Sequence, residues 1–450
     1  MLNQVRPASR GHVAVIGSGI SGLSAAWLLS RSRRVTLYEA DARPGGHANT
    51  VDVPSETGPI AVDTGFIVYN DRNYPELVSL FDHLSVPTLP SDMSFAASLD
   101  GGRFEYSGSG LRGLLGQKAN VVRPRFWRML ADVLRFYREA PSLLIERKHA
   151  DETLGSYLRL SGYSEGFIND HLLPMGAAIW STTSEEMREY PLHAFISFFE
   201  RHGLLSLSDR PRWRTVAGGS RTYVRRLLDD FDGELRLSTP VANVRRLKHG
   251  VEVTDTSGHK ERFDDVVIAT HADQALKFLE DASETEHRLL SAFSYTPNTA
   301  VLHKNTDLMP KRQSVWSSWN YIERDRKAGN RQLCVTYWMN RLQNIDHSHP
   351  LFVTLNPSQD IPDEDVIQAF DYTHPLFNHA ALSAQKQLWQ LQGNRNTWFC
   401  GAYFGSGFHE DGIRAGLGAA ELLAGIAAPW KSGKVDAAAA RRDEALVAAE

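Results

Sequence analysis

A glycine-rich turn near the start of the chain, set between an apolar run and a helical stretch, constrains the fold most. His12-Val-Ala-Val-Ile16 is apolar and rich in β-branched residues, as in a buried parallel strand. Gly17-Ser-Gly-Ile-Ser-Gly22 follows, then a helical pattern over residues 23–30 and a second strand pattern that ends at Glu39. This order predicts a βαβ unit of an α/β fold that binds a dinucleotide.

Each glycine of the turn has an expected role. Gly17 permits the tight turn, Gly19 lets the backbone approach a diphosphate, and Gly22 lets the helix pack on the strand. The helix N-terminus supplies amide donors and a partial positive charge for the diphosphate. We therefore expect Ser18, Ile20 and Ser21 beside the dinucleotide, and Glu39 to accept hydrogen bonds from ribose hydroxyls. The alternative is a glycine-rich turn in an unrelated α/β protein.

A second stretch, Gly108-Ser-Gly-Leu-Arg-Gly113, has the same glycine spacing. The residues before it are a mixed segment, and Arg123-Pro-Arg125 stands where a second strand would be needed. We predict a loop here, and only one dinucleotide site in the chain.

Composition excludes several classes of protein. With 42% hydrophobic and 23% charged residues, the 450-residue chain is typical of a globular protein of two or three domains, at about 150 residues per domain. A net charge of −4 gives no basic excess for nucleic acid. Cys334 and Cys400 are too few for a disulfide framework, and no metal-ligand spacing occurs. Glycines and serines interrupt the apolar stretch 13–29, so we predict no membrane span and a cytoplasmic protein.

The segment after Glu39 extends the pattern. Glu39, Arg43 and the pair Gly45-Gly46 recur at this spacing in the flavin amine oxidase and phytoene desaturase superfamily, which the chain resembles. That superfamily usually has Arg where this chain has His47, and Val62-Asp-Thr-Gly-Phe66 resembles its Asp-x-Gly stretch beside the isoalloxazine. The resemblance implies FAD, with further contacts from Ala40, Arg43, Gly45, Gly46, His47, Thr64, Gly65 and Phe66.

Downstream segments carry the same resemblance. Ser238-Thr-Pro-Val241 resembles a strand whose backbone touches the adenine, which implies a contact from Val241. Phe399-Cys-Gly401 and His409-Glu-Asp-Gly-Ile413 resemble the C-terminal flavin signature, which implies contacts from Gly401, Asp411, Gly412 and Ile413. The fold implied is a Rossmann-type FAD domain of the glutathione-reductase-like, amine oxidase type, with a mixed α+β substrate domain.

Further segments, including Gly46-His-Ala-Asn49 and Gly407-Phe-His-Glu-Asp-Gly412, resemble one bacterial branch of this superfamily. Its members are flavoproteins often encoded beside cyclopropane-fatty-acyl-phospholipid synthases. The branch implies desaturation of a methyl-branched or cyclopropane fatty acyl phospholipid by hydride transfer to flavin N5, and association with such a synthase. Two alternatives stay open: a flavin amine oxidase, and a non-catalytic flavin-binding partner of the synthase.

The order of these segments predicts an interleaved domain arrangement. We assign residues 1–75, 213–285 and 395–430 to the FAD domain, and residues 76–212 and 286–394 to the substrate domain. Residues 431–450 form an Ala-rich, charged tail.

A basic segment stands out in a chain of negative net charge. Residues 103–148 hold ten Lys or Arg and four acids, and residues 125–139 have apolar side chains at helical spacing. Arg125, Arg128, Arg135 and Arg138 alternate with them. Such a helix suits an anionic membrane surface, and the alternative is a domain helix with a solvated basic face.

Candidate chemistry falls on a few side chains. As substrate-pocket residues, with the core as the alternative, we name Trp180, Trp316, Trp319, Tyr321 and Tyr337. His409 and Glu410 are the catalytic candidates, His409 as a pocket residue and proton acceptor. The alternative is that His409 fixes its loop by hydrogen bonds. Lys304 is the one candidate for the lysine that amine oxidases place near the flavin.

Overall fold

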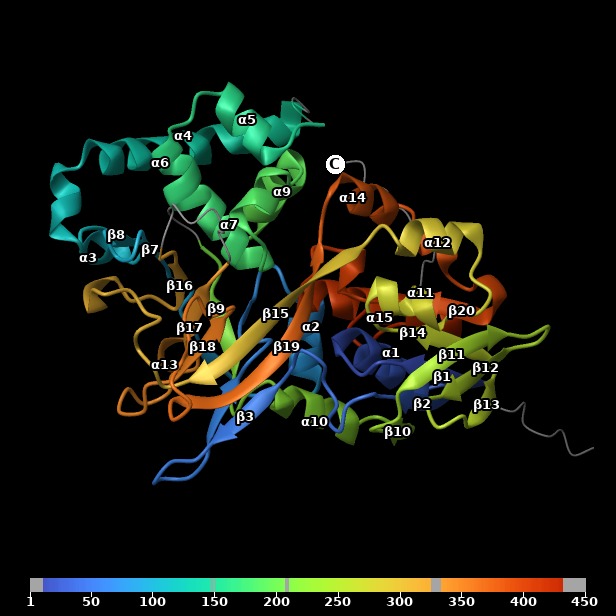
Figure 1. The fold of residues 1–450 in the computed structure, drawn as a ribbon. Helices are drawn as coiled ribbons and strands as arrows, with labels where there is room; N and C mark the ends of the chain where they lie inside the picture. The colour runs from blue at the N-terminus through green and yellow to red at the C-terminus, as the bar shows by residue number, and fades with distance from the viewer. Residues whose placement is uncertain (1–10, 147–148, 150, 207–209, 325–332, 432–450) are drawn as a thin grey trace, which may run out of the picture.

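A five-stranded parallel sheet holds the expected βαβ unit (Figure 1). The computed structural model describes residues 11–431 except 147, 148, 150, 207–209 and 325–332, so the predicted tail lies largely outside the described residues. The unit consists of β1 (His12–Ile16), α1 (Ile20–Ser30) and β2 (Arg34–Tyr38). The sheet has the order β10-β2-β1-β14-β20, with β10 (Glu234–Arg236), β14 (Asp265–Ile268) and β20 (Thr397–Phe399). The predicted α/β class is confirmed, and the sheet draws its strands from separate stretches of the chain.

The first and last long helices pack against each other beside this sheet. All residues of α1 are buried. It contacts α15 (His409–Ala424) so closely that a Cβ atom at Gly416 would lie 2.1 Å from the carbonyl oxygen of Ser21. A glycine is needed there for the two backbones to approach.

A seven-stranded sheet, which contains the long strands β15 and β19 in Figure 1, forms the second large layer. Its order is β19-β15-β18-β17-β16-β7-β8. These strands are β7 (Phe95–Leu99), β8 (Phe104–Ser107), β15 (Ser294–His303), β16 (Trp319–Ile322), β17 (Val335–Trp338), β18 (Phe352–Leu355) and β19 (Val366–Leu376). The long antiparallel pair β15 and β19 runs from this sheet toward α12 (Glu284–Leu290) and α14 (His379–Gln385).

The second glycine stretch follows the last strand of this sheet, and only its first two residues, Gly108 and Ser109, form the predicted loop; from Gly110 on the stretch is helical. It follows β8, which pairs antiparallel with β7, and it enters the short helix α3 (Gly110–Leu114). The next helix begins at Pro124, so no parallel strand follows, and this stretch forms no βαβ unit.

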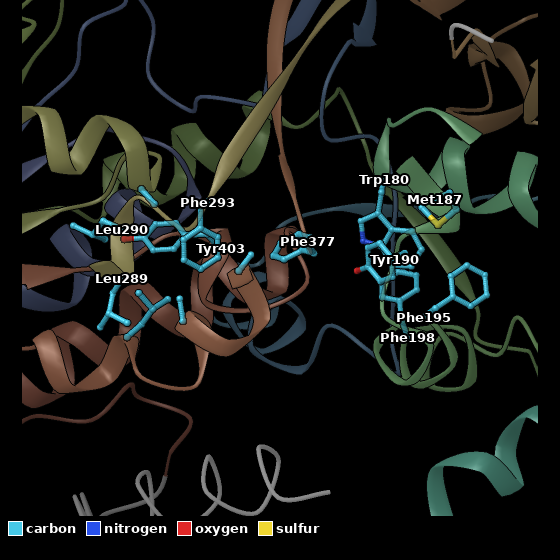
Figure 2. Close-up of a cluster of buried hydrophobic side chains, with 14 of the residues drawn as sticks. Trp180, Met187, Tyr190, Phe195, Phe198, Leu289, Leu290, Phe293, Phe377 and Tyr403 are labelled. Carbon is cyan, nitrogen blue, oxygen red and sulfur yellow. The ribbon is translucent and has the colours of Figure 1, made fainter. Parts of the chain in front are cut away.

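Helices cover one face of the seven-stranded sheet (Figure 1). They are α4 (Pro124–Glu146), α5 (Leu154–Leu160), α6 (Glu165–Phe167), the π-helical turn η2 (Ile168–Leu172), α7 (Leu173–Trp180), α8 (Ser184–Arg188) and α9 (Leu192–Arg201). The aromatic cluster around Trp180 joins α7 to α9. Figure 2 shows Trp180, Tyr190, Phe195 and Phe198 on one side of this core and Phe293 and Tyr403 on the other.

Small sheets and further helices complete the described fold. The strands are β3 (Thr50–Val53) with β4 (Ile60–Asp63), β5 (Tyr69–Asn70) and β6 (Thr88–Pro90) with β9 (Trp213–Val216), and β11 (Val241–Arg246), β12 (Val251–Asp255) and β13 (Lys260–Phe263). The helices include α2 (Pro75–His83), α10 (Arg221–Asp229), α11 (Ala272–Phe278), α12 (Glu284–Leu290), α13 (Met339–Leu342) and α14 (His379–Gln385). Buried Asp63 joins distant segments, because it accepts hydrogen bonds from the backbone N–H of Ser220 (2.8 Å) and from Gln343 Nε2 (2.9 Å). The domain boundaries stay a prediction.

Candidate active site

A cavity of about 1340 Å³ extends from the glycine turn to the seven-stranded sheet and the helices that cover it. At one end it is lined by Gly17 and Gly19, and at the other by Phe95 and Trp319. Its lining includes exposed apolar side chains of α3 and α4, among them Leu111, 76% exposed, and Leu134, 54% exposed, and we call this part of the lining the mouth.

The glycine turn presents backbone amides to this cavity. Gly17 has a φ of +99°, and its N–H donates to the carbonyl oxygen of Tyr38 at 2.8 Å. A Cβ atom at Gly19 would meet no atom within 4 Å, so this side of the turn is open, whereas at Gly22 it would lie 1.8 Å from the oxygen of Gly17. No side chain caps the N-terminus of α1. These features fit a diphosphate, whose oxygens would accept from the free amides.

Glu39 braces the turn from the end of β2. One carboxylate oxygen accepts from the backbone N–H of Ser18 at 2.9 Å and from the Ser18 hydroxyl, and the other accepts from the N–H of Asp41. Glu39 also lines the cavity, with Thr239 and Val241 beside it in the lining. Its contact with a ribose stays a prediction.

Most of the expected cofactor residues line this one cavity. They are Gly17, Ser18, Gly19, Ile20, Ser21, Glu39, Ala40, Arg43, Gly46, His47, Thr64, Gly65, Phe66, Val241 and Gly401. Close backbone contacts hold them together: a Cβ atom at Gly46 would lie 3.1 Å from Gly19 Cα, and one at Gly65 would lie 2.2 Å from the oxygen of His47.

Four further expected contact residues lie outside the lining of this cavity, and their contacts with the cofactor stay a prediction. Gly45 donates its N–H to the oxygen of Ser18 at 3.0 Å. Asp411 accepts from the N–H of Phe408 at 3.0 Å and thereby closes the first turn of α15. Gly412 packs against Ile20, and Ile413 is fully buried. None of these four lines the cavity.

Partly buried histidines lie beside the cofactor end of the cavity. The ring of His47 lies 4.8 Å from that of Tyr372 and 5.5 Å from that of His374. Burial lowers the pKa of His47 well below its usual value and that of His374 to about 4, so both are neutral near neutral pH. His47 Nε2 is buried and has no hydrogen-bond partner among the described residues, which leaves it for a bound group. His374 was missed because β19 brings it here from a distant part of the chain.

The open glycine turn, the braced acid and the unpartnered histidine nitrogen suit a flavin dinucleotide. A family model for flavin-containing amine oxidoreductases matches residues 20–373, more than half of the chain. The chain belongs to this family. The resemblance to the flavin amine oxidase superfamily is confirmed, and the cofactor of this protein is FAD.

Known proteins resemble this flavoprotein to different extents. Protoporphyrinogen oxidase 2 of Arabidopsis thaliana is 40% identical over 85 residues, which cover 19% of this chain and 16% of that protein. A fatty acid isomerase from P. acnes matches with a TM-score of 0.62 and 15% identity, over 93% of this chain and 99% of the other. Cyclohexylamine oxidase from Brevibacterium oxydans IH-35A matches with a TM-score of 0.64 and 17% identity, over 92% and 99%. At such identities the structures show the shared fold.

His409 is held rigidly where α15 begins. Its ring stacks on Phe66 with centroids 3.7 Å apart, and its Nε2 lies 3.1 Å from the Tyr223 hydroxyl. It lines the cavity, and burial lowers its pKa to about 3, so it is neutral near neutral pH. These contacts also fit the alternative in which His409 fixes its loop.

Glu410 contacts the neighbouring helix α2, and its expected catalytic role stays a prediction. Its carboxylate accepts from the N–H groups of Glu76 (3.0 Å) and Leu77 (3.1 Å) in the first turn of α2. It lies outside the cavity lining, and burial raises its pKa to about 7. Glu410 therefore caps α2.

Trp180, Trp319 and Tyr337 line the cavity beyond the cofactor residues, whereas two expected pocket residues do not. Trp316 donates its indole N–H to the oxygen of Pro310 at 2.7 Å and packs edge-on against Trp338. Tyr321 is 2% exposed, and its hydroxyl lies 3.5 Å from that of Ser184. Tyr321 belongs to the core, and Trp316 is partly buried outside the cavity lining.

We call the part of the cavity between the seven-stranded sheet and α4, α7 and α9 the chamber. Its wall is mostly apolar and includes Leu114, Leu130, Val133, Met175, Ile179 and Leu204. The acids among the described lining residues are Glu39 and Asp41, at the cofactor end, and the exposed Asp371 of β19. Lys304 is exposed and lies outside the lining. Helix residues of the chamber were missed because their sequence pattern resembles that of any buried helix.

Proposed function

We propose that this FAD-dependent oxidoreductase dehydrogenates the acyl chain of a phospholipid, with a methyl-branched or cyclopropane fatty acyl group as the substrate. The observation that carries this proposal is the apolar chamber, whose described wall offers no buried carboxylate. An uncharged hydrocarbon chain enters such a space without an electrostatic cost, whereas an ammonium group would lose its hydration without a counter-charge.

In this proposal the side chains that line the chamber bind and orient the acyl substrate. The apolar side chains of α4 and α7 exclude water, and Trp319 and Tyr337 give the chamber a rigid wall. Bound FAD supplies the acceptor for a hydride. His409 is our candidate for a residue that contacts the reacting part of the acyl substrate. Its ring is neutral, and it lines the cavity where it stacks on Phe66, one of the expected cofactor residues.

The similar structures allow more than one substrate class. The fatty acid isomerase, by its name, acts on a fatty acid, so the fold can accommodate an acyl chain. Other similar structures are amine oxidases, such as putrescine oxidase bound to putrescine. The apolar chamber favours the acyl substrate for this chain.

We further propose that the mouth of the chamber docks on an anionic membrane. Leu111 and Leu134 line the mouth, and Trp127 of α4 is 50% exposed. In the described part of the chain, no helix is both long and apolar enough to cross a bilayer. A surface contact of this kind would let an acyl chain pass directly into the chamber. The proposed association with a cyclopropane-fatty-acyl-phospholipid synthase would bring the same lipids.

The basic residues of α4 divide into two groups, which refines the predicted surface. Arg125 forms an ion pair with the buried Asp170 at 2.7 Å, and Arg135 pairs with Glu139 at 3.1 Å. These two arginines contribute to the fold. Arg128 and Arg138 are exposed, and the contact of Arg138 with Glu139 is long, at 3.9 Å, so both cations are accessible to a membrane surface.

An anaerobic reduction experiment tests the substrate. The oxidised holoenzyme is mixed with vesicles of cyclopropane, methyl-branched or straight-chain phospholipid, and separately with primary amines, while flavin absorbance is recorded. We expect one of the modified lipids to bleach the flavin. Trp319→Ala should slow bleaching, and Trp316→Ala, outside the lining, should leave it unchanged. Bleaching by amines alone, or by no lipid, would contradict the proposal.

A further inference from the structure

His171 carries a polar atom that the fold does not use. The residue is 8% exposed and lines the cavity beside Tyr106 and Met175. Its Nε2 is buried and has no hydrogen-bond partner among the described residues. A buried acceptor without a partner is unfavourable, so this nitrogen invites a bound group.

The surrounding hydrogen bonds determine which nitrogen carries the proton. The Tyr106 hydroxyl donates to the backbone oxygen of Asp170 at 2.8 Å, which uses its single hydrogen. His171 Nδ1 lies 3.0 Å from the same hydroxyl oxygen and must therefore be the donor. In the neutral ring Nε2 is then the acceptor. Burial lowers the pKa of His171 to about 4, consistent with a neutral ring near neutral pH.

The position of this histidine is fixed by two elements. It belongs to the π-helical turn η2, an irregularity that is frequent at functional sites. Asp170, next to it, is anchored by two hydrogen bonds from Arg125, at 2.7 and 2.9 Å. Tyr106 reaches it from β8, across the sheet from Ala97 of β7. His171 is thus held in place before any ligand arrives.

We propose that His171 is a positioning residue that accepts a hydrogen bond from a neutral hydroxyl group of the substrate. The inference rests on the proposed function only for the assignment of the chamber to an acyl substrate. A hydroxyl suits the site because a neutral imidazole gives no charge to balance an ammonium group, and because no acid of the described lining lies in this part of the chamber.

The hydroxyl can belong to the acyl chain or to a glycerol headgroup, and paired ligands distinguish the two. Oxidised holoenzyme is titrated with hydroxystearate and with stearate, and separately with monoolein and with methyl oleate, while the shift of the flavin spectrum reports binding. In one of the two pairs, the hydroxyl lies where His171 can accept its hydrogen bond. In that pair we expect the hydroxylated ligand to bind about 3- to 10-fold more tightly than its partner without a hydroxyl.

Variants assign this preference to the histidine. His171→Phe should abolish it without weakening the ligand that lacks a hydroxyl, and His171→Gln, which has an acceptor oxygen, should restore part of it. Tyr106→Phe should reduce it, because the ring would no longer be held in one tautomer. His202→Phe replaces another lining histidine, whose Nδ1 bonds to the oxygen of Phe198, and should keep the preference.

The outcomes separate this inference from the proposed function. Equal affinity within both pairs in the wild-type protein would overturn the role of His171 and leave an acyl substrate intact. Flavin that responds to amines and to none of the four ligands would overturn both. If His171→Phe does not fold, the wild-type preference and Tyr106→Phe decide the question.

Discussion

Gly19 is the residue at which the cofactor site can be blocked with the least damage to the fold. A side chain there would point into open space in the cavity. We expect Gly19→Val to fold and to purify without FAD, because the added methyl groups take the place of the cofactor beside the amides of α1. The ratio of flavin to protein absorbance measures this, with thermal unfolding as the test of folding. Gly19→Ala should keep part of its FAD, and a fully yellow Gly19→Val would exclude the proposed path of the diphosphate.

Glu410 gives the protein a predictable dependence on pH. Its pKa is about 7 in the folded state and near 4.5 in an unfolded chain, so the folded state binds the proton more tightly. The contribution of this group to the free energy of unfolding is therefore largest below about pH 4.5 and is lost as the pH rises toward about 7. Glu410→Gln cannot ionise and still accepts a backbone hydrogen bond.

We therefore expect the free energy of unfolding of Glu410→Gln to fall less than that of the wild type between about pH 5 and about pH 7, with a difference of roughly 2 kcal/mol. Denaturation at several pH values measures it. Asp63, whose pKa burial raises to about 6, contributes equally in both proteins. A tenfold loss of kcat in folded Glu410→Gln, which corresponds to an increase on the order of 1.4 kcal/mol in the activation free energy, would instead indicate a catalytic role for Glu410.

The sequence predicts single residues well only where the backbone itself makes the site. Gly17 and Gly19 are recognisable because a turn of this shape requires glycines in that order. Trp316 and Trp319 are only three positions apart, yet only the second lies in a strand and lines the cavity. Aromatic composition cannot separate them, because the start of the strand decides which one faces the chamber. His171 gave no signal, since its partner Tyr106 is 65 residues away.

At the scale of elements, helices and strands held together by residues close in sequence were predicted correctly, whereas pairings between distant segments were not. The βαβ unit was predicted because its strand, turn and helix are consecutive. The pairing of β15 with β19 was not, since it joins Ser294 to Leu376 across some of the longest strands of the fold. The helical pattern of residues 125–139 correctly predicted a helix. It could not show that Arg125 would form an ion pair with Asp170, because that acid lies 45 residues further along the chain.

The exposed face of α4 carries the prediction on membrane binding. We expect the double variant Trp127→Ser and Arg128→Ser to sediment about tenfold less with vesicles rich in phosphatidylglycerol at low salt, because it loses an apolar anchor and a cation. Arg225→Ser provides a matched control, since Arg225 is exposed on α10, far from α4 in Figure 1. Unchanged sedimentation of the double variant would exclude this face as the docking surface.

At the scale of the whole molecule, the contact between α1 and α15 joins the two ends of the described chain. A Cβ atom at Gly416 would collide with the backbone of Ser21, whereas at Gly418 it would meet only the ring of Trp389. We expect Gly416→Ala to lower the free energy of unfolding by about 3 kcal/mol, as overpacking does, and to weaken FAD binding. Gly418→Ala should be close to the wild type, because a side chain can move aside. Thermal melts and FAD titration measure both, and equal behaviour of the two variants would refute the role of this contact.

This contact has a consequence for biosynthesis. The ribosome makes α15, which covers α1, about 400 residues after α1, and this takes roughly 20 to 80 seconds at usual elongation rates. Until then α1, whose residues are all buried in the finished fold, lacks the helix that covers it and is exposed to aggregation and to chaperones. The nascent enzyme therefore cannot capture its vitamin-derived cofactor between these helices until α15 has been made.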